Sequence, residues 1–273
     1  MLQLYFSSSR FRSYLPDWGI VLVLFFIFFY ITEQIQPFER QFTINDPRLL
    51  HPFAKVERVS DHQLYFYSTV LPILIIMISS LLLGGNQFEK YHLAQKSILA
   101  LLFSVSSVSV LTDILKVWIG NHRPDFIVRC GPKKGTPTNR MVNVAEVCTA
   151  PLGEAYLADG MKSTPSGHSS MAFAGLFFLS LWVIGQWKLL SRKASGRSQW
   201  HKGESTIANV IVACLPTLLA TYIGLSRTQD YRHHFFDVGF GTFLGVLFAS
   251  LLYWKYFGFT ESTGEENDLV DYV

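Results

Sequence analysis

Charged residues are scarce in this chain: Asp, Glu, Lys and Arg together make up 16% of its 273 residues, whereas hydrophobic residues make up 49%. Soluble globular domains typically carry about 25% charged residues. The charges are also unevenly placed, because long apolar stretches contain almost none of them. This distribution argues against an ordinary soluble domain and predicts a protein embedded in a membrane.

Other absences exclude further classes. The formal net charge is only +3, and no basic stripe is interleaved with aromatic residues, which argues against nucleic acid as a partner. The three cysteines do not have the spacing of a zinc site. Cys130 and Cys148 lie in one polar segment, where an oxidising compartment could join them in a disulfide; two free thiols are the alternative interpretation.

Six apolar segments can be interpreted as membrane spans, and an all-α bundle of six transmembrane helices is therefore the predicted fold. Crossing the hydrocarbon core of about 30 Å takes about 20 residues. The first segment is short and must borrow flanking residues, and the absence of a small-residue cleavage site after it predicts a retained signal anchor. The predicted spans are residues 18–32, 64–83, 97–120, 163–187, 205–226 and 234–254.

The orientation follows from the basic residues in the loops. Residues 188–204 contain five Lys or Arg against one acidic residue, which favours the cytosol for this loop. Both termini are then cytosolic, so we expect a cytosolic segment 1–17, a membrane domain 18–257 and an acidic, disordered tail 258–273. The opposite face is lumenal or extracellular, in a vacuole, the ER or Golgi, or the plasma membrane; the organelle and the oligomeric state stay open.

Three cations lie near predicted helix ends on the non-cytosolic side. Lys116 ends the third span, and Gly120 and Pro124 predict that the helix stops before Arg123. Together with Arg227 they could bind a phosphoryl group, because guanidinium groups match its oxygens. Interfacial snorkelling of the long side chains is the structural alternative. Asp113, three residues before Lys116, is expected to pair with it.

Residues 163–168 read Ser-Thr-Pro-Ser-Gly-His at the start of the fourth span. We expect Thr164 to cap a helix that starts at the proline, so that the backbone N–H groups of Ser166 and Gly167 point outward and bind an anion. His168 would lie in the first turn, placed to give a proton to a leaving oxygen. A structural cap with an incidental histidine is the alternative.

His233 and Asp237 are four residues apart at the start of the sixth span and would share one face of a helix. A carboxylate could then hold one ring nitrogen and leave the other free to attack phosphorus. Two alternatives are a metal site that includes His168 and His234, and a hydrogen-bonded interfacial pair without a catalytic role. The neighbouring cations disfavour a divalent metal ion.

These three groups of residues resemble the signatures of the type 2 phosphatidic acid phosphatase, or lipid phosphate phosphatase, superfamily. The matching stretches are Lys116 to Pro124, Pro165 to His168 and Ser226 to Asp237. The Gly-Asn-His-Arg-Pro-Asp-Phe stretch at 120–126, with the Arg-Cys pair that follows at 129–130, further resembles fungal members that include the diacylglycerol pyrophosphate phosphatases.

The resemblance implies a Mg²⁺-independent membrane enzyme without a cofactor that hydrolyses phosphatidate, diacylglycerol pyrophosphate or related lipid phosphates through a phosphohistidine. It assigns His233 as the nucleophile, Asp237 as the residue that orients it and His168 as the proton donor. Polyprenyl diphosphate or sphingoid-base phosphate is the alternative substrate, and a non-catalytic binder or transporter of anionic headgroups is the alternative class. The implied phosphate-binding residues are Lys116, Arg123, Ser166, Gly167 and Arg227.

Overall fold

The computed structural model describes residues 2–83, 86–187 and 207–258, and its secondary structure within these ranges is helical apart from two isolated β-bridges. Six of the described helical stretches are long and apolar enough to cross a membrane, which confirms the predicted all-α architecture. They run Ser9–Tyr30, Asp61–Leu83, Gln87–Ile119, Gly167–Gln186, Ile207–Gln229 and Phe235–Phe257. The predicted cytosolic loop 188–204 and the tail after Gly258 lie outside the described residues.

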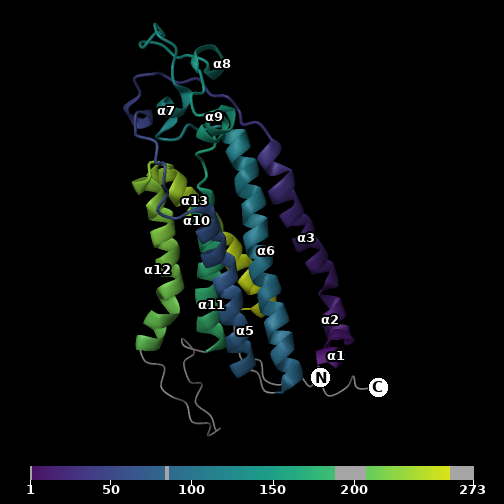
Figure 1. Cartoon of the computed structure of the whole chain (residues 1–273). Coiled ribbons are helices and arrows are strands. Elements are labelled where there is room, and N and C mark those ends of the chain that lie inside the picture. Colours follow the sequence, from purple (N-terminus) through teal and green to yellow (C-terminus); the bar gives the residue numbers. More distant parts are fainter. Residues whose placement is uncertain (1, 84–85, 188–206, 259–273) are drawn as a thin grey trace.

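The helices stand side by side, with α6 (Gln87–Ile119) in contact with α3 (Leu15–Tyr30), α5 (Leu71–Leu83), α10 (Gly167–Ala172) and α13 (Phe235–Phe257) (Figure 1). The fourth span continues from α10 into α11 (Phe178–Gln186) and is the most buried of the six. In its lower half Trp182 is fully buried, and its indole nitrogen donates a 2.8 Å hydrogen bond to the Ser97 hydroxyl. The last two spans are α12 (Ile207–Gln229) and α13.

The first three spans begin earlier than predicted, and the first and third do so by more than two helical turns, because their first turns are polar but find partners inside the protein. The third starts at Gln87 rather than residue 97, capped by Asn86, and its 33 residues extend about 50 Å. Its first turns pack against α1 (Leu2–Phe6), whose buried Tyr5 hydrogen-bonds Gln95. The first span, α2 (Ser9–Ser13) and α3, includes Asp17, whose carboxylate accepts a 2.7 Å hydrogen bond from Tyr256.

Two spans contain a π-helical turn, and these turns meet at a glycine. The second span passes from α4 (Asp61–Tyr65) through η3 (Phe66–Val70) to α5, and the fourth has η4 (Phe173–Phe177) between α10 and α11. A Cβ atom at Gly175 would lie 1.8 Å from the backbone oxygen of Ser68. The close approach of the two spans therefore requires glycine at this position.

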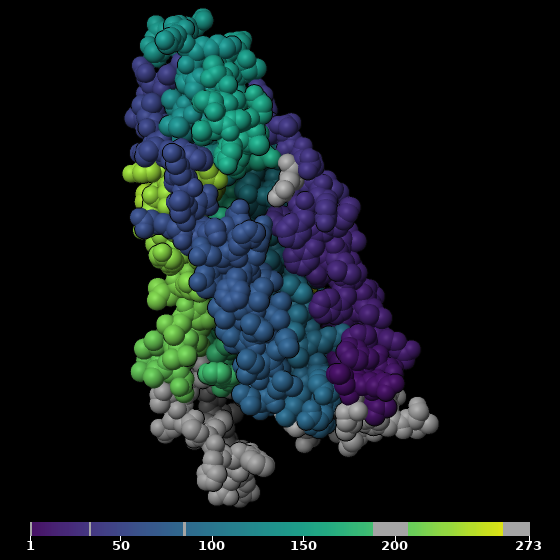
Figure 2. All heavy atoms as spheres, in the orientation of Figure 1, coloured from purple at the N-terminus to yellow at the C-terminus, as the bar shows by residue number. Residues whose placement is uncertain are grey.

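The loops 35–60 and 121–162 fold together into a polar cap at one end of the bundle, drawn in dark blue and teal at the top of Figure 2. The cap has its own small apolar core, and one backbone bridge joins Phe42 in the first loop to Val142 in the second. Its short helices are η2 (Pro47–Leu49), α7 (Phe126–Cys130), α8 (Val144–Val147) and α9 (Glu154–Gly160), and η1 (Thr32–Gln34) leads into it from the first span.

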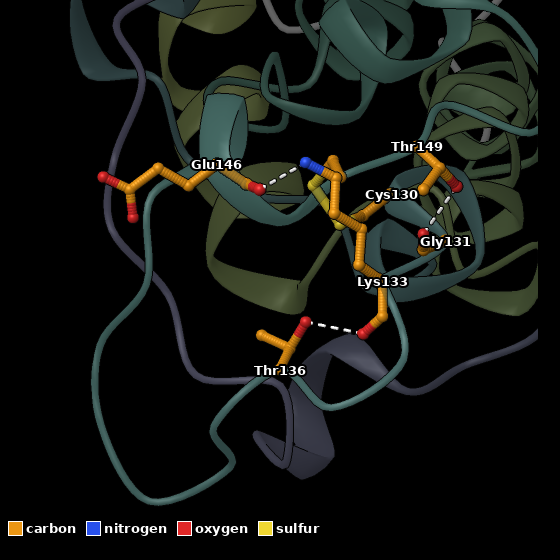
Figure 3. The surroundings of a disulfide bond; sticks show 7 residues. Cys130, Gly131, Lys133, Thr136, Glu146 and Thr149 are labelled. Atoms are coloured by element: carbon orange, nitrogen blue, oxygen red, sulfur yellow. Dashed lines mark hydrogen bonds between the residues drawn. A yellow bond between two sulfur atoms is a disulfide. The ribbon is translucent and has the colours of Figure 1, made fainter.

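Cys130 and Cys148 are joined by a disulfide within the cap (Figure 3). Backbone and side-chain contacts hold the same turn: the Lys133 ammonium donates a 2.6 Å hydrogen bond to the Glu146 carbonyl, and the Thr149 hydroxyl donates one of 2.7 Å to the Gly131 carbonyl. The irregular segment 132–143 is thus anchored at both ends, by the disulfide on one side and the Phe42 bridge on the other.

Candidate active site

A cavity of about 450 Å³ lies where the upper ends of the spans meet the cap. Residues that are far apart in the sequence line it, including the three predicted cations and both predicted catalytic histidines. Of the sequence-predicted site residues, Lys116, Arg123, Gly167, His168, Arg227 and His233 line it. Ser166 and Asp237 are fully buried behind this surface.

Arg123 reaches the cavity because α6 ends where the sequence predicted. Gly120 takes a left-handed conformation with φ of 59°, and a Cβ there would collide with the backbone oxygen of Phe38. The Arg123 guanidinium then binds Asp159 through a 2.6 Å ion pair and a 2.8 Å hydrogen bond to its backbone carbonyl. Burial lowers the pKa of Arg123 to about 10, so it remains a cation at neutral pH.

Lys116 lies beside the start of α10. Its ammonium forms a 2.9 Å ion pair with Asp113, which confirms the predicted pairing within the third span. A Cβ atom at Gly167 would lie 2.9 Å from the Lys116 nitrogen, so the glycine lets the cation approach the helix start. An anion at this position would meet both the ammonium and the first turn of the helix.

The helix start differs from the prediction. Ser166, not Thr164, caps the helix: its hydroxyl accepts a hydrogen bond from the Ser169 amide, and α10 begins at Gly167. The Thr164 hydroxyl is instead bound to the Asp237 carboxylate, and the Ser166 amide donates a 3.0 Å hydrogen bond to the Asp237 carbonyl. The Ser166 amide is therefore not free to bind an anion, and only the first residues of α10 itself keep that geometry.

His233 does not share a helix with Asp237, in contrast to the prediction. The residue precedes α13, whose N-cap is His234. Its Nδ1 atom lies 2.7 Å from the backbone oxygen of Ser163 and 3.9 Å from the nearest Asp237 oxygen. A carbonyl can only accept a hydrogen bond, so Nδ1 carries the proton and Nε2 has the free lone pair.

Asp237 organises the surroundings of this histidine instead of contacting it closely. Its carboxylate accepts a 2.6 Å hydrogen bond from the Ser163 hydroxyl, another from Thr164, and one of 2.9 Å from the His234 amide. The carboxylate thus ties the segment that carries the Ser163 carbonyl to the start of α13. It acts on the His233 ring through that segment.

Burial and the neighbouring cations favour the neutral form of His233. Burial lowers its pKa well below the usual value of 6.5, and the charges of Arg123, Arg227 and Lys116 lower it further. The ring is only 4% exposed. A neutral imidazole with a free Nε2 is the protonation state that nucleophilic attack needs.

His168 faces the cavity from the first turn of α10. Its Nε2 atom lies 3.1 Å from the backbone oxygen of Val59 and 3.7 Å from an Asp61 carboxylate oxygen. Both partners come from the segment that leads from the cap into the second span. The histidine that would donate a proton to a leaving group is therefore bound to this segment in the structure.

Sequence reasoning did not identify several residues that complete the site. Glu57 binds Arg227 and Arg232, and Asp159 binds Arg123, Arg129 and Arg232. Both acids lie in irregular cap segments or a short helix without a recognisable motif. Asp159 lies shortly before the motif that starts at Ser163, whereas Glu57 is far in the sequence from all three motifs, so no sequence signal pointed to Glu57.

The described residues contain no group of three or more His, Cys, Asp or Glu side chains arranged to hold a metal ion. His234 and Asp237 are close, with Nδ1 3.3 Å from the carboxylate, but the other neighbours of this carboxylate are hydroxyls and an amide. The alternative of a metal site has no ligand set among these residues.

The bundle has six membrane spans and, at one end, a cationic cavity that contains two histidines. These features are those of an integral membrane enzyme that acts on an anionic substrate. In a comparison with protein families, residues 97–261 match the PAP2 superfamily, and the chain belongs to this superfamily. The matched region contains every residue proposed for catalysis or phosphate binding. No solved structure matches the chain.

Curated relatives match over most of the chain. Diacylglycerol pyrophosphate phosphatase 1 of Saccharomyces cerevisiae is 41% identical over 87% of this chain and 78% of its own length. A probable diacylglycerol pyrophosphate phosphatase 1 of Schizosaccharomyces pombe is 34% identical over 88% of this chain and 80% of its own. Lipid phosphate phosphatase 2 of Arabidopsis thaliana is 31% identical over 90% of this chain and 78% of its own.

Proposed function

We propose that the protein is a metal-independent lipid phosphate phosphatase that acts on diacylglycerol pyrophosphate, phosphatidate or a related lipid phosphate. The observation that carries this proposal is the convergence of Lys116, Arg123 and Arg227 with His168 and His233 on one cavity at the ends of the membrane spans. The cations would hold the phosphoryl oxygens of the substrate.

In the proposed reaction, the free Nε2 of His233 attacks phosphorus as the bond to the leaving oxygen breaks. His168 donates a proton to that oxygen, which leaves as the lipid alcohol or lipid monophosphate. A water molecule then attacks the phosphohistidine and gives its proton to His168. The N–P bond breaks, inorganic phosphate is released, and the free His233 imidazole and protonated His168 are restored. Fixed cations and backbone amides would stabilise the charge that develops on the phosphoryl oxygens.

The three motifs specify the phosphoryl chemistry and leave the lipid open, so a polyprenyl diphosphate or a sphingoid-base phosphate remains the second substrate proposal. The names of the fungal relatives favour diacylglycerol pyrophosphate. A non-catalytic headgroup binder would need the cations but not a neutral imidazole held in one tautomer, which favours the enzyme.

The cavity is proposed to face the lumen or the exterior, with both termini in the cytosol. The disulfide in the cap supports this orientation, because disulfides persist in oxidising compartments. The organelle, whether vacuole, ER or Golgi, or plasma membrane, is left to localisation experiments.

The test is phosphate release by the detergent-solubilised protein in excess EDTA, with diacylglycerol pyrophosphate, phosphatidate and a polyprenyl diphosphate as substrates. We expect chelator-resistant release and its loss in His233→Ala, since the nucleophile is removed. Folded protein that releases no phosphate from any substrate would support the headgroup binder. Activity that appears only with added metal would contradict the mechanism.

A further inference from the structure

The segment Glu57 to Val59 occupies donor atoms of the proposed phosphate site. One Glu57 carboxylate oxygen lies 3.0 Å from Nη2 of Arg227 and the other lies 3.1 Å from Nε of Arg232. The Val59 carbonyl accepts a 2.9 Å hydrogen bond from Nη1 of Arg227 and contacts Nε2 of His168 at 3.1 Å. Two residues expected to meet the phosphoryl group are thus engaged by this one segment.

The two arginines are incompletely satisfied by this arrangement. The Nε atoms of Arg227 and Arg232 are both buried, and neither makes a well-aligned hydrogen bond among the described residues, although a Glu57 oxygen lies 3.1 Å from Nε of Arg232. Nε and Nη2 form one edge of a guanidinium, which an oxyanion takes with two parallel hydrogen bonds. Glu57 spreads its two oxygens over two arginines, and Asp159 holds Nη2 of Arg232. A phosphoryl group has three outer oxygens, so two could bind the Nε and Nη2 edge of Arg227 while the third binds Nε of Arg232.

Both arginines have other partners that would keep them in place without Glu57. Arg232 binds Asp159 at 3.0 Å, and Arg227 lies 3.5 Å from Asp230. The backbone carbonyl of Arg227 also accepts the amides of Arg232 and His233, which sets the relative positions of the three residues. The two guanidinium groups therefore form a preorganised pair.

Glu57 itself is less constrained. It lies in irregular backbone of the cap shortly before α4, next to Val56, whose side chain is 86% exposed. The Glu57 side chain is 23% exposed. Its carboxylate can rotate into solvent without breaking a helix.

We propose that Glu57 is a displaceable counter-ion in the free protein, and that the phosphoryl group of the substrate takes its place between Arg227 and Arg232. Arg232 is then a further phosphate-binding residue, at a position within the third motif to which no role was assigned from the sequence. This proposal rests on the proposed function for the identity of the ligand. Inorganic phosphate and orthovanadate share the relevant chemistry and allow binding to be measured without turnover.

The experiment is calorimetric titration of the full-length, detergent-solubilised protein with orthovanadate and with inorganic phosphate. Glu57→Gln should bind both anions about tenfold more tightly, the size of one partly buried charge interaction. Adding Arg232→Gln to this variant should abolish the gain, because the vacated position loses its second cation. Glu154→Gln removes an exposed carboxylate of the cap outside the cavity and should leave binding unchanged.

Unchanged or weaker anion binding in folded Glu57→Gln would overturn the proposal and make Glu57 a structural partner of the arginines. If Glu57→Gln does not fold, Glu57→Asp replaces it. Its shorter carboxylate cannot bridge both arginines, so it should also bind anions more tightly; no gain in this variant contradicts displacement.

A parallel measurement separates this proposal from the proposed function. The KM for phosphatidate in mixed micelles should fall in Glu57→Gln if the lipid headgroup displaces the same carboxylate. Tighter anion binding without turnover of any lipid phosphate would keep the counter-ion proposal and reject the phosphatase. Turnover by the unmodified protein together with weaker anion binding in Glu57→Gln would keep the phosphatase and reject the counter-ion proposal.

Discussion

The imidazole of His233 is held by the backbone carbonyl of Ser163, whose oxygen lies 2.7 Å from Nδ1. The contact selects the Nδ1–H tautomer without a direct carboxylate partner, and the carboxylate of Asp237 fixes the segment that supplies the carbonyl. In the proposed mechanism, the orientation of the nucleophile would therefore be shared between a backbone carbonyl and a side-chain carboxylate.

Replacement of Asp237 should impair turnover more than replacement of Ser163. Asp237→Asn weakens the hydrogen bonds to Ser163 and Thr164 and should lower kcat on the order of 10²-fold. Ser163→Ala removes only the hydroxyl and keeps the carbonyl, so a loss below about tenfold is expected. Measured kcat values for both variants check this order, and an equal or larger loss in Ser163→Ala would contradict it.

The loss of activity caused by replacing His168 should depend on the leaving group of the substrate. With a lipid phosphate, His168→Asn should lower kcat by about 10²- to 10⁴-fold, because an alkoxide is a poor leaving group without a proton. With p-nitrophenyl phosphate the first step needs little protonation. The burst of p-nitrophenol should therefore survive while phosphoenzyme hydrolysis slows. Rapid-mixing kinetics on both substrates tests this, and equal loss of the burst would argue against a proton donor.

Burial and the neighbouring cations lower the pKa of His233 well below 6.5, so the ring should stay neutral when the pH falls through that value. An unfolded chain gains a proton near pH 6.5 and the folded protein does not. The stability contribution of the neutral ring is therefore complete above about pH 6.5 and decreases as the pH falls below it.

Nitrogen-15 NMR of ring-labelled histidine, with His233→Ala to assign the signal, measures this titration and the tautomer together. The expected spectrum shows a neutral Nδ1–H ring at pH 6.5. A His233 signal that is half protonated at or above that pH would indicate a solvated ring and contradict the site geometry.

Gly175 should be required for stability, because its Cβ position lies 1.8 Å from the Ser68 backbone oxygen where two spans meet. Gly175→Ala must push the spans apart and should cost roughly 1–3 kcal/mol or more. Gly239→Ala is the matched control: this glycine is also in a span, and a Cβ there meets nothing within 4 Å. Thermal unfolding in detergent should separate the two variants; equal melting temperatures would show that the spans can shift without cost.

The orientation of the cap can be tested with an added glycosylation site. Met141→Thr creates an Asn-Arg-Thr sequence at Asn139 on the cap, where Met141 is 60% exposed. If the cap faces the lumen, expression in a eukaryotic cell should add a glycan that endoglycosidase removes. A folded, active variant that stays unglycosylated would favour the inverted orientation.

The spans and the chemical groups of the site were predictable because their signals are local. A run of apolar residues indicates a membrane helix by itself, and Gly120 before Pro124 indicates where the third helix ends. The errors arose where a polar residue had a distant partner. The first span was predicted to start after Asp17 and to borrow flanking residues, whereas its helix continues through Asp17, whose carboxylate accepts a hydrogen bond from Tyr256. Thr164 was predicted to cap a helix, but its hydroxyl binds Asp237.

The sequence by itself determined the membrane architecture and the supply of cations and histidines, since both depend on residue type and short spacing. The tertiary structure alone decided how those groups are held. Ser163 and His233 are 70 residues apart, and Val59 and Arg227 are 168 apart. Contacts at such separations form only when whole spans pack and the cap closes over them, and no local pattern in the chain encodes which carbonyl or carboxylate will then lie against each ring or guanidinium.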